Sequence, residues 1–206
     1  MGKSLLIIFV KNPELGKVKT RLAATVGNEV ALAIYYQLLQ KTREATGLVQ
    51  ADKVVYYSEY IDHDDLWDND RYMKMRQEGE SLGDRMKRAF CKAFDEGYEK
   101  VCVIGSDCMD ISGNLIKEAF QKLGNSPAVI GPSHDGGYYL LGMNRMIPEV
   151  FENKAWSTDE VFISTVEDLN KLGLEHRELP VLSDVDTEKD LGDWAAVMNT
   201  SGSSLN

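Results

Sequence analysis

Carboxylates and cations stand directly after apolar runs at several places in the chain. Residues 101–110 read VCVIGSDCMD, a wholly apolar run that stops at Gly105 and then delivers Asp107. Such a run predicts a buried parallel strand, and open α/β sheets bind ligands beyond the carboxyl ends of their strands. Mg²⁺ typically takes one or two protein carboxylates together with substrate phosphates. Asp107 is therefore the first candidate for chemistry, and capping of the following helix is the alternative.

A basic segment follows the first apolar run of an otherwise acidic protein. Residues 11–22, KNPELGKVKTRL, carry the cations Lys11, Lys17, Lys19 and Arg21. Clustered cations on a strand-to-helix loop suit a nucleoside diphosphate or triphosphate. The segment is not a Walker P-loop, because Val18 stands where Ser or Thr should follow the lysine. A solvated basic loop is the alternative.

Two glycine-containing segments can also approach a ligand. In QEGESLGDRM, residues 77–86, Gly79 and Gly83 flank a helix start, and Arg85 in its first turn can meet a phosphate or a base edge. In GPSHDGGYYLLG, residues 131–142, a glycine pair permits close backbone approach, and the tyrosines that follow can stack or donate hydrogen bonds. A helix cap and a hairpin with core aromatics are the respective alternatives.

The late segment LSDVDTEKDL, residues 182–191, holds two alternating carboxylates ahead of a helix start. Period-2 spacing places Asp184 and Asp186 on the same side of an extended chain, where both can face one cation. Carboxylates also favour helix N-termini, which is the alternative.

Composition excludes several classes of protein. The 206 residues can bury one substantial core, and we expect a single domain over residues 1–199 with a flexible tail at 200–206. The formal net charge of -10 argues against nucleic acid or an anionic membrane as a partner. No apolar run approaches the roughly 20 residues that span a bilayer, so a cytoplasmic protein without membrane insertion is expected. The three cysteines lack metal-type spacing and are expected to be reduced and structural.

Apolar runs alternate with helical periods, which predicts a mainly parallel sheet covered on both faces. Strands are expected at residues 4–10, 53–58, 72–76, 101–104 and 128–131, and helices at 29–40, 82–94 and 115–123. The Asp-Gly-Gly turn before residues 138–141 predicts one antiparallel strand. Three capping boxes are expected, at Ser81 with Asp84, at Ser157 with Glu160 before a helix at 161–172, and at Thr187 with Asp190 before the last helix.

Six motifs occur in an order typical of one family: KNPELGKVKTRL, QEGESLGDRM, IGSDCMDI, GPSHDGGYYLLG, WSTDEV and DVDTEKDL. Over about residues 4–197 the chain resembles bacterial nucleotide-diphospho-sugar transferases of the glycosyltransferase A-type superfamily, in a branch catalogued as a conserved domain of unknown function. It is more distantly similar to the nucleotidylyltransferases that build molybdenum-cofactor dinucleotides and deazaflavin cofactors. The resemblance implies a three-layer α/β/α sandwich of Rossmann-like type, with a nucleotide site over the strand ends of a mixed, mainly parallel sheet.

The resemblance also implies roles for individual positions. The candidate nucleotide-binding residues are Lys11, Gly16, Lys19, Arg21, Gln77, Gly79, Arg85, Gly136 and Gly137. Asp107 stands where the superfamily places its metal carboxylate, and Asp186 matches the late ligand of Mg²⁺ or Mn²⁺. The first loop departs from the glycine-rich loop of pyrophosphorylase-like members because it holds only Gly16, and Met109 stands where the family more often has Pro.

The leading hypothesis is metal-dependent transfer of a sugar from a nucleotide-diphosphate-sugar donor to a small acceptor. Asp107 and Asp186 would hold the metal ion on the diphosphate, and Lys19 and Arg21 would stabilise the charge of the leaving group. Asp135 would serve as the acceptor-side base or as a further metal contact, which makes Asp107, Asp135 and Arg21 the catalytic candidates. The alternatives are nucleotidylyl transfer with release of pyrophosphate, and a non-catalytic nucleotide-binding module.

Overall fold

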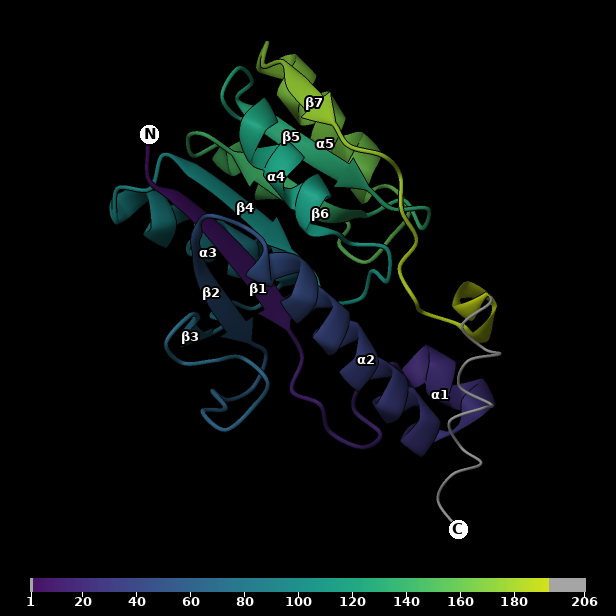
Figure 1. Ribbon diagram of the computed structural model, residues 1–206. Coiled ribbons are helices and arrows are strands. Elements are labelled where there is room, and N and C mark those ends of the chain that lie inside the picture. Colours follow the sequence, from purple (N-terminus) through teal and green to yellow (C-terminus); the bar gives the residue numbers. More distant parts are fainter. Residues whose placement is uncertain (1, 193–206) are drawn as a thin grey trace.

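The computed structural model describes residues 2–192, which form one seven-stranded mixed sheet. In spatial order the strands are β3 (Met73–Arg76), β2 (Asp52–Tyr57), β1 (Ser4–Val10), β4 (Lys100–Ile104), β6 (Tyr138–Met143), β5 (Ala128–Pro132) and β7 (His176–Glu178) (Figure 1). All neighbouring pairs are parallel except β4 with β6 and β5 with β6. The mainly parallel sheet and its single antiparallel insertion are therefore confirmed.

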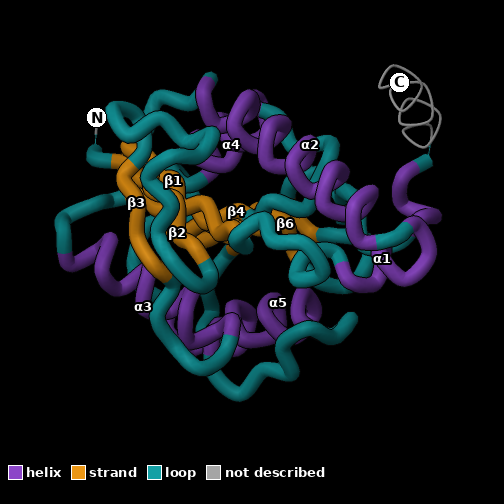
Figure 2. Tube along the Cα trace, turned by 90° about the horizontal axis from the view of Figure 1, so that it is seen from below, coloured by secondary structure: helices purple, strands orange, loops and turns teal. Residues whose placement is uncertain are grey.

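Helices cover both faces of the sheet (Figure 2). One face carries α1 (Thr20–Val26), α2 (Asn28–Gly47) and α4 (Gly113–Lys122), while the other carries α3 (Leu82–Asp95) and α5 (Val161–Lys171). Two 3₁₀ helices, η1 (Pro148–Phe151) and η2 (Glu188–Leu191), complete the described elements. This arrangement confirms the three-layer sandwich with a Rossmann-like sheet.

Strand β1 shows why the sheet is buried on both faces. Its residues Leu6, Ile8 and Val10 belong to the core under α1, α2 and α4, whereas the alternate residues Leu5 and Ile7 belong to the core under α3 and α5. Side chains of a strand point to opposite faces in turn, so an uninterrupted apolar run is the pattern of a strand covered on both sides.

Of the three expected helix caps, the structure confirms two and corrects the third. Ser81 caps α3 by accepting a hydrogen bond from the Asp84 amide, and the Thr187–Asp190 box is complete at the start of η2. Ser157 does not cap α5, because its backbone is left-handed with φ 66° and the helix begins after Glu160 without a side-chain cap. The expected box at Ser157 is therefore wrong.

Two short elements were not predicted, because neither is long enough to show a periodic pattern of apolar residues. The basic segment enters helix α1 at Thr20 instead of continuing as a loop, and the three-residue strand β7 extends the sheet beyond β5. The last helix, expected after Thr187, begins as the 3₁₀ helix η2, and its continuation and the expected tail at residues 200–206 lie outside the described residues. No described helix is long and apolar enough to cross a membrane. The three cysteines are free, and two of them are buried.

Several segments that carry candidate functional residues meet at one edge of the sheet. The parallel strands β1 and β4 end there, so Lys11 and the loop of Asp107 emerge side by side. The antiparallel strand β6 begins at the same edge, because Tyr138 pairs with Pro132 at the end of β5. Isolated bridges tie Cys108 to Asp184 and Ser133 to Leu182, which brings the late acidic segment to this edge as well.

Candidate active site

A cleft of about 900 Å³ opens over this edge of the sheet. Nine of the candidate catalytic, nucleotide-binding and metal-binding residues line the cleft: Lys11, Lys19, Arg21, Gln77, Arg85, Asp107, Asp135, Gly137 and Asp186. Three glycines do not line it: Gly16, Gly79 and Gly136. These three have φ values of 75°, 138° and 84°, so they shape the turns that carry the lining residues.

Lys19 is the central cation of the cleft. It is the residue before the first turn of α1, has a left-handed backbone with φ 49°, and its side chain is only 5% exposed. Its ammonium lies 2.5 Å from Asp107 Oδ1 and 3.4 Å from Asp186 Oδ1. A non-glycine residue in this conformation costs roughly 1–2 kcal/mol, so the strain is held by the surrounding packing.

Asp107 and Asp186 converge on that one ammonium from loops that are far apart in sequence. Asp186 is also 3.6 Å from Arg21, whose side chain is largely exposed to solvent. The Asp107 backbone carbonyl accepts a hydrogen bond from the Val185 amide, which fixes the acidic segment against the end of β4. The two carboxylates are thus placed where one cation can bridge them.

Asp184 is a further carboxyl that lines the same cleft. Burial raises the pKa of Asp184 to about 7, with a further contribution from the negative charges of Asp107 and Asp135 and an opposing one from Lys19. The cleft is lined by more carboxyl groups than cations, and the raised pKa of Asp184 relieves part of the repulsion among them.

Asp184→Asn is expected to stabilise the metal-free protein at alkaline pH by about 1–2 kcal/mol, which discounts the full pKa difference for partial exposure. The native state holds this proton up to pH about 7, whereas an unfolded aspartate releases it near its ordinary pKa of 3.8. The free energy of unfolding of the parent protein should therefore fall as the pH rises through that window. Urea denaturation in EDTA at several pH values measures the effect.

The matched control for this substitution is Asp110→Asn, which removes an exposed carboxyl from the same neighbourhood outside the cleft. It should leave the pH dependence of stability unchanged. An Asp184→Asn protein with the parent's pH profile would contradict the assignment of the raised pKa.

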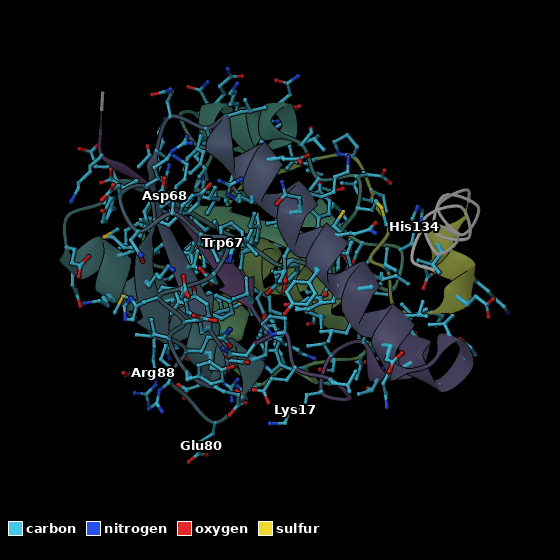
Figure 3. The ribbon with its side chains drawn as sticks, turned by 60° about the horizontal axis from the view of Figure 1, so that its bottom comes forward. Lys17, Trp67, Asp68, Glu80, Arg88 and His134 are labelled. Atoms are coloured by element: carbon cyan, nitrogen blue, oxygen red, sulfur yellow. The ribbon has the colours of Figure 1, made fainter. Side chains whose placement is uncertain are left out.

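Gln77 and Arg85 line the cleft near the start of α3, and both side chains donate hydrogen bonds to other groups of the protein. The Gln77 side-chain amide donates to the carbonyls of Val10 and Tyr56, which ties the segment to the sheet. Arg85 donates to the Gly79 carbonyl at 3.1 Å and to Gln77 Oε1 at 3.4 Å. Glu80 also lines this side, and its side chain projects outward from the molecule (Figure 3).

Asp135 is held in the turn before β6. Its Oδ1 accepts hydrogen bonds from the Gly137 amide at 2.9 Å and from the Ser133 hydroxyl. Tyr139 donates its hydroxyl to the Pro180 carbonyl and belongs to the core, as the hairpin alternative predicts. Tyr138 lines the cleft, and its hydroxyl is the one buried side-chain polar atom without a hydrogen-bond partner among residues 2–192.

The sequence predicted only a helix cap in the segment between η1 and α5 and no functional residue, although WSTDEV stood out as a motif. Its residues Trp156, Ser157, Thr158 and Asp159 all line the cleft. The indole of Trp156 lies against Gly83 at the start of α3, where a Cβ atom would overlap the ring. Ser157 has a left-handed backbone, and no pattern of side chains in the sequence predicts that conformation.

The donor atoms of the cleft suit a hard cation that is shared with a ligand. Within residues 2–192, no group of three or more His, Cys, Asp or Glu side chains is arranged as a metal site. Asp107 and Asp186 nevertheless converge on one positive centre, and Mg²⁺ commonly takes two carboxylates with substrate phosphates and water completing its shell. The residues therefore fit a metal ion that binds together with a phosphate ligand.

Comparison with known proteins identifies relatives at two levels. Residues 41–158 match the family described as "Uncharacterized protein conserved in bacteria (DUF2064)". A solved protein from Desulfovibrio desulfuricans G20, provisionally described as a nucleotide-diphospho-sugar transferase, is 38% identical with a TM-score of 0.87, covering 98% of this chain and 90% of that one. A search of curated proteins finds no significant match.

Two further solved structures share the fold at low sequence identity. The 4-diphosphocytidyl-2C-methyl-D-erythritol synthase of Anaerococcus prevotii DSM 20548 is 12% identical with a TM-score of 0.61, over 96% of each chain. The inositol-1-phosphate CTP transferase of T. maritima is 13% identical with a TM-score of 0.59, over 100% of this chain and 98% of that one. At these identities the likeness concerns the fold alone.

Proposed function

The chain belongs to the DUF2064 family, and on that premise we propose that it transfers a sugar from a nucleotide-diphosphate-sugar donor to a small acceptor. One observation carries the proposal: a single cleft places the buried Lys19 ammonium between Asp107 and Asp186, with Arg21 beside them. The relative at 38% identity, provisionally described as such a transferase, supports the choice of donor.

In this proposal the β1–α1 segment binds the diphosphate. Lys19 can move its charge contact from the carboxylates to a phosphate oxygen, and Arg21 is exposed and free to add a bidentate contact. The bond between the anomeric carbon and the diphosphate oxygen breaks, and both cations stabilise the negative charge that remains on the leaving group.

Asp107 and Asp186 would hold Mg²⁺ or Mn²⁺ in this site. Such an ion, when bound, supplies further positive charge to the diphosphate. Asp135, which lines the same cleft, would take the proton of the acceptor hydroxyl as the new bond to the anomeric carbon forms. The hydrogen bonds from Gly137 and Ser133 fix the carboxylate of Asp135 for that role.

Nucleotidylyl transfer is the second candidate, because the distant fold neighbours include a CTP transferase and a diphosphocytidyl-transferring synthase. In that reaction the nucleoside triphosphate releases pyrophosphate while a phosphorylated acceptor attacks the α-phosphate. The same cations and carboxylates would serve both reactions, so the ligand decides between them.

A thermal-shift panel of nucleotide sugars, nucleoside diphosphates and triphosphates, each with and without Mg²⁺ or Mn²⁺, tests the proposal. A ligand at 100 times its Kd stabilises the native state by about 2.7 kcal/mol. We expect metal-dependent stabilisation by a nucleotide sugar that is lost in Asp107→Asn and kept in Asp110→Asn. Stabilisation by triphosphates alone, with release of pyrophosphate, would favour nucleotidylyl transfer, and no shift with any ligand would overturn both.

A further inference from the structure

One buried hydroxyl connects the loop after β1 with the loop after β4. Tyr35, on α2, is 1% exposed, and its ring packs in the core under α1, α2 and α4. Its hydroxyl oxygen accepts a hydrogen bond from the Lys11 amide at 2.8 Å and donates to the Lys11 carbonyl at 3.1 Å. The buried hydroxyl of Ser106 lies 3.1 Å from the same oxygen. A tyrosine hydroxyl has one proton and also accepts, so all three contacts are satisfied when Ser106 donates to Tyr35.

This hydroxyl bridge, formed by Tyr35 and Ser106, begins where the strand pairing ends. The paired register of β1 and β4 stops at Ile8 with Ile104. Lys11 is the first residue after β1, and Ser106 lies in the loop that follows β4. The bridge therefore continues the connection between the two strands into the loops that line the cleft.

Each of the two loops also has an anchor that does not depend on Tyr35. Toward β2, the Asn12 side chain accepts hydrogen bonds from the amides of Glu59 and Tyr60 and donates to the Tyr60 carbonyl. Toward the late acidic segment, the Asp107 carbonyl accepts a hydrogen bond from the Val185 amide. These anchors fix each loop to a different neighbour, whereas the hydroxyl bridge fixes the loops to each other.

We propose that Tyr35 is a positioning residue, whose hydroxyl fixes the cations of the first loop relative to Asp107 so that both reach one diphosphate. The inference rests on the proposed function, because it takes the diphosphate as the ligand that the two loops share. The ion pair between Lys19 and Asp107 also joins the loops, but in the proposed reaction Lys19 exchanges that contact for a phosphate oxygen. The hydroxyl bridge stays in place during this exchange.

The surroundings of Tyr35 suit a fixed spacer. Burial, with a smaller contribution from the negative charge of Asp107, raises the pKa of the Tyr35 hydroxyl above its ordinary value, so the group stays neutral. Hydrogen bonds among buried groups are electrostatically stronger than those in water. Where a ligand is held from several loops, a displacement of about 1 Å can lower the rate roughly 10²-fold. Loss of the bridge should therefore affect a ligand that needs both loops.

Two dissociation constants measured by isothermal titration calorimetry test the proposal: that of Mn²⁺ alone, and that of the Mn²⁺ complex of inorganic pyrophosphate. Tyr35→Phe keeps the buried ring and removes only the hydroxyl. We expect it to weaken binding of the pyrophosphate complex by about tenfold, as is typical for groups that orient metal and ligand contacts. Mn²⁺ alone should bind within about twofold of the parent, because the Val185 amide holds Asp107 without Tyr35.

Tyr72→Phe is the matched control, because it also removes a buried hydroxyl that contacts α2. Tyr72 is 3% exposed, its hydroxyl lies 3.0 Å from that of Thr46, and it does not line the cleft. Both dissociation constants should match the parent in this variant. The positioning role is overturned if Tyr35→Phe also matches the parent, or if it weakens Mn²⁺ and the pyrophosphate complex by the same factor.

Ser106→Ala breaks the same bridge from the other loop, and it tests the proposal even where Tyr35→Phe does not fold. We expect Ser106→Ala to weaken binding of the pyrophosphate complex by about tenfold as well. The double variant should also lose about tenfold, because both substitutions remove one shared contact. A loss near the product of the two single effects, about a hundredfold, would mean that the hydroxyls act separately, and it would overturn the bridge.

The parent protein separates this proposal from the proposed function. If the parent binds the pyrophosphate complex and both single variants bind it equally well, the positioning role is removed and the diphosphate site stands. If the parent binds pyrophosphate neither with Mn²⁺ nor without it, the diphosphate site is removed and the positioning role falls with it.

Discussion

Lys19→Met is expected to lower the rate of transfer by about 10²–10³-fold, the usual effect of removing one fixed charge that stabilises a transition state. Lys19 is the only one of the four cations in the described cleft that is buried and also contacts both Asp107 and Asp186. Methionine keeps the length and apolar stem of the side chain and removes only its charge. Steady-state turnover with the nucleotide sugar identified by thermal shift measures the loss.

The control for this variant is Lys17→Met, which lies two residues away in the same segment. The Lys17 side chain is 68% exposed and points away from the body of the molecule (Figure 3). Its pKa is raised by a hydrogen bond and ion pair with Glu14, and it does not line the cleft. Turnover in Lys17→Met should match the parent, and a Lys19→Met protein within about threefold of the parent would exclude Lys19 from the charge-stabilising role.

Asp168→Ala is expected to destabilise the protein by about 3 kcal/mol, because it leaves the Lys154 ammonium buried without a carboxylate partner. Lys154 is 1% exposed, and Asp168 is the acid that it contacts at 2.6 Å. Burial tends to raise the pKa of Asp168, but hydrogen bonds from Lys154 and Lys171 outweigh this and lower the pKa overall. This contribution to stability is therefore present at neutral pH and is lost as the pH falls through the lowered pKa.

Two variants control for this prediction in urea denaturation. Glu96→Ala breaks the exposed ion pair with Lys92 and should cost less than about 0.5 kcal/mol. The double variant Lys154→Met with Asp168→Ala should recover part of the loss, because no charge then remains buried. A loss below about 1 kcal/mol in Asp168→Ala would show that Lys154 does not depend on this carboxylate.

The stability of this ion pair bears on the site as well as on the fold. Lys154 anchors the chain just before Trp156 through Asp168 and Ser164, so Asp168→Ala is also expected to loosen the cleft-lining segment at residues 156–159.

Most of the sheet could be predicted because its pattern is local. Uninterrupted apolar runs such as residues 4–10 bury both faces of a strand, and the Asp-Gly-Gly turn before Tyr138 permits only a chain reversal. Helix α1 and strand β7 escaped prediction because each is too short to establish a period, so their conformations depend on neighbours in space. The Ser157 box failed because a cap also needs an extended backbone, whereas Ser157 is left-handed with φ 66°.

The sequence by itself determined which segments reach the functional edge, because strand order along the chain and the position of each apolar run decide where loops emerge. It thereby placed Lys19, Asp107, Asp135 and Asp186 on loops that can meet. Only the tertiary structure decided that Lys19 bridges Asp107 and Asp186, that burial raises the pKa of Asp184, and that Trp156 packs against Gly83. These features depend on distances and burial between residues separated by up to 167 positions, and no local pattern encodes such distances.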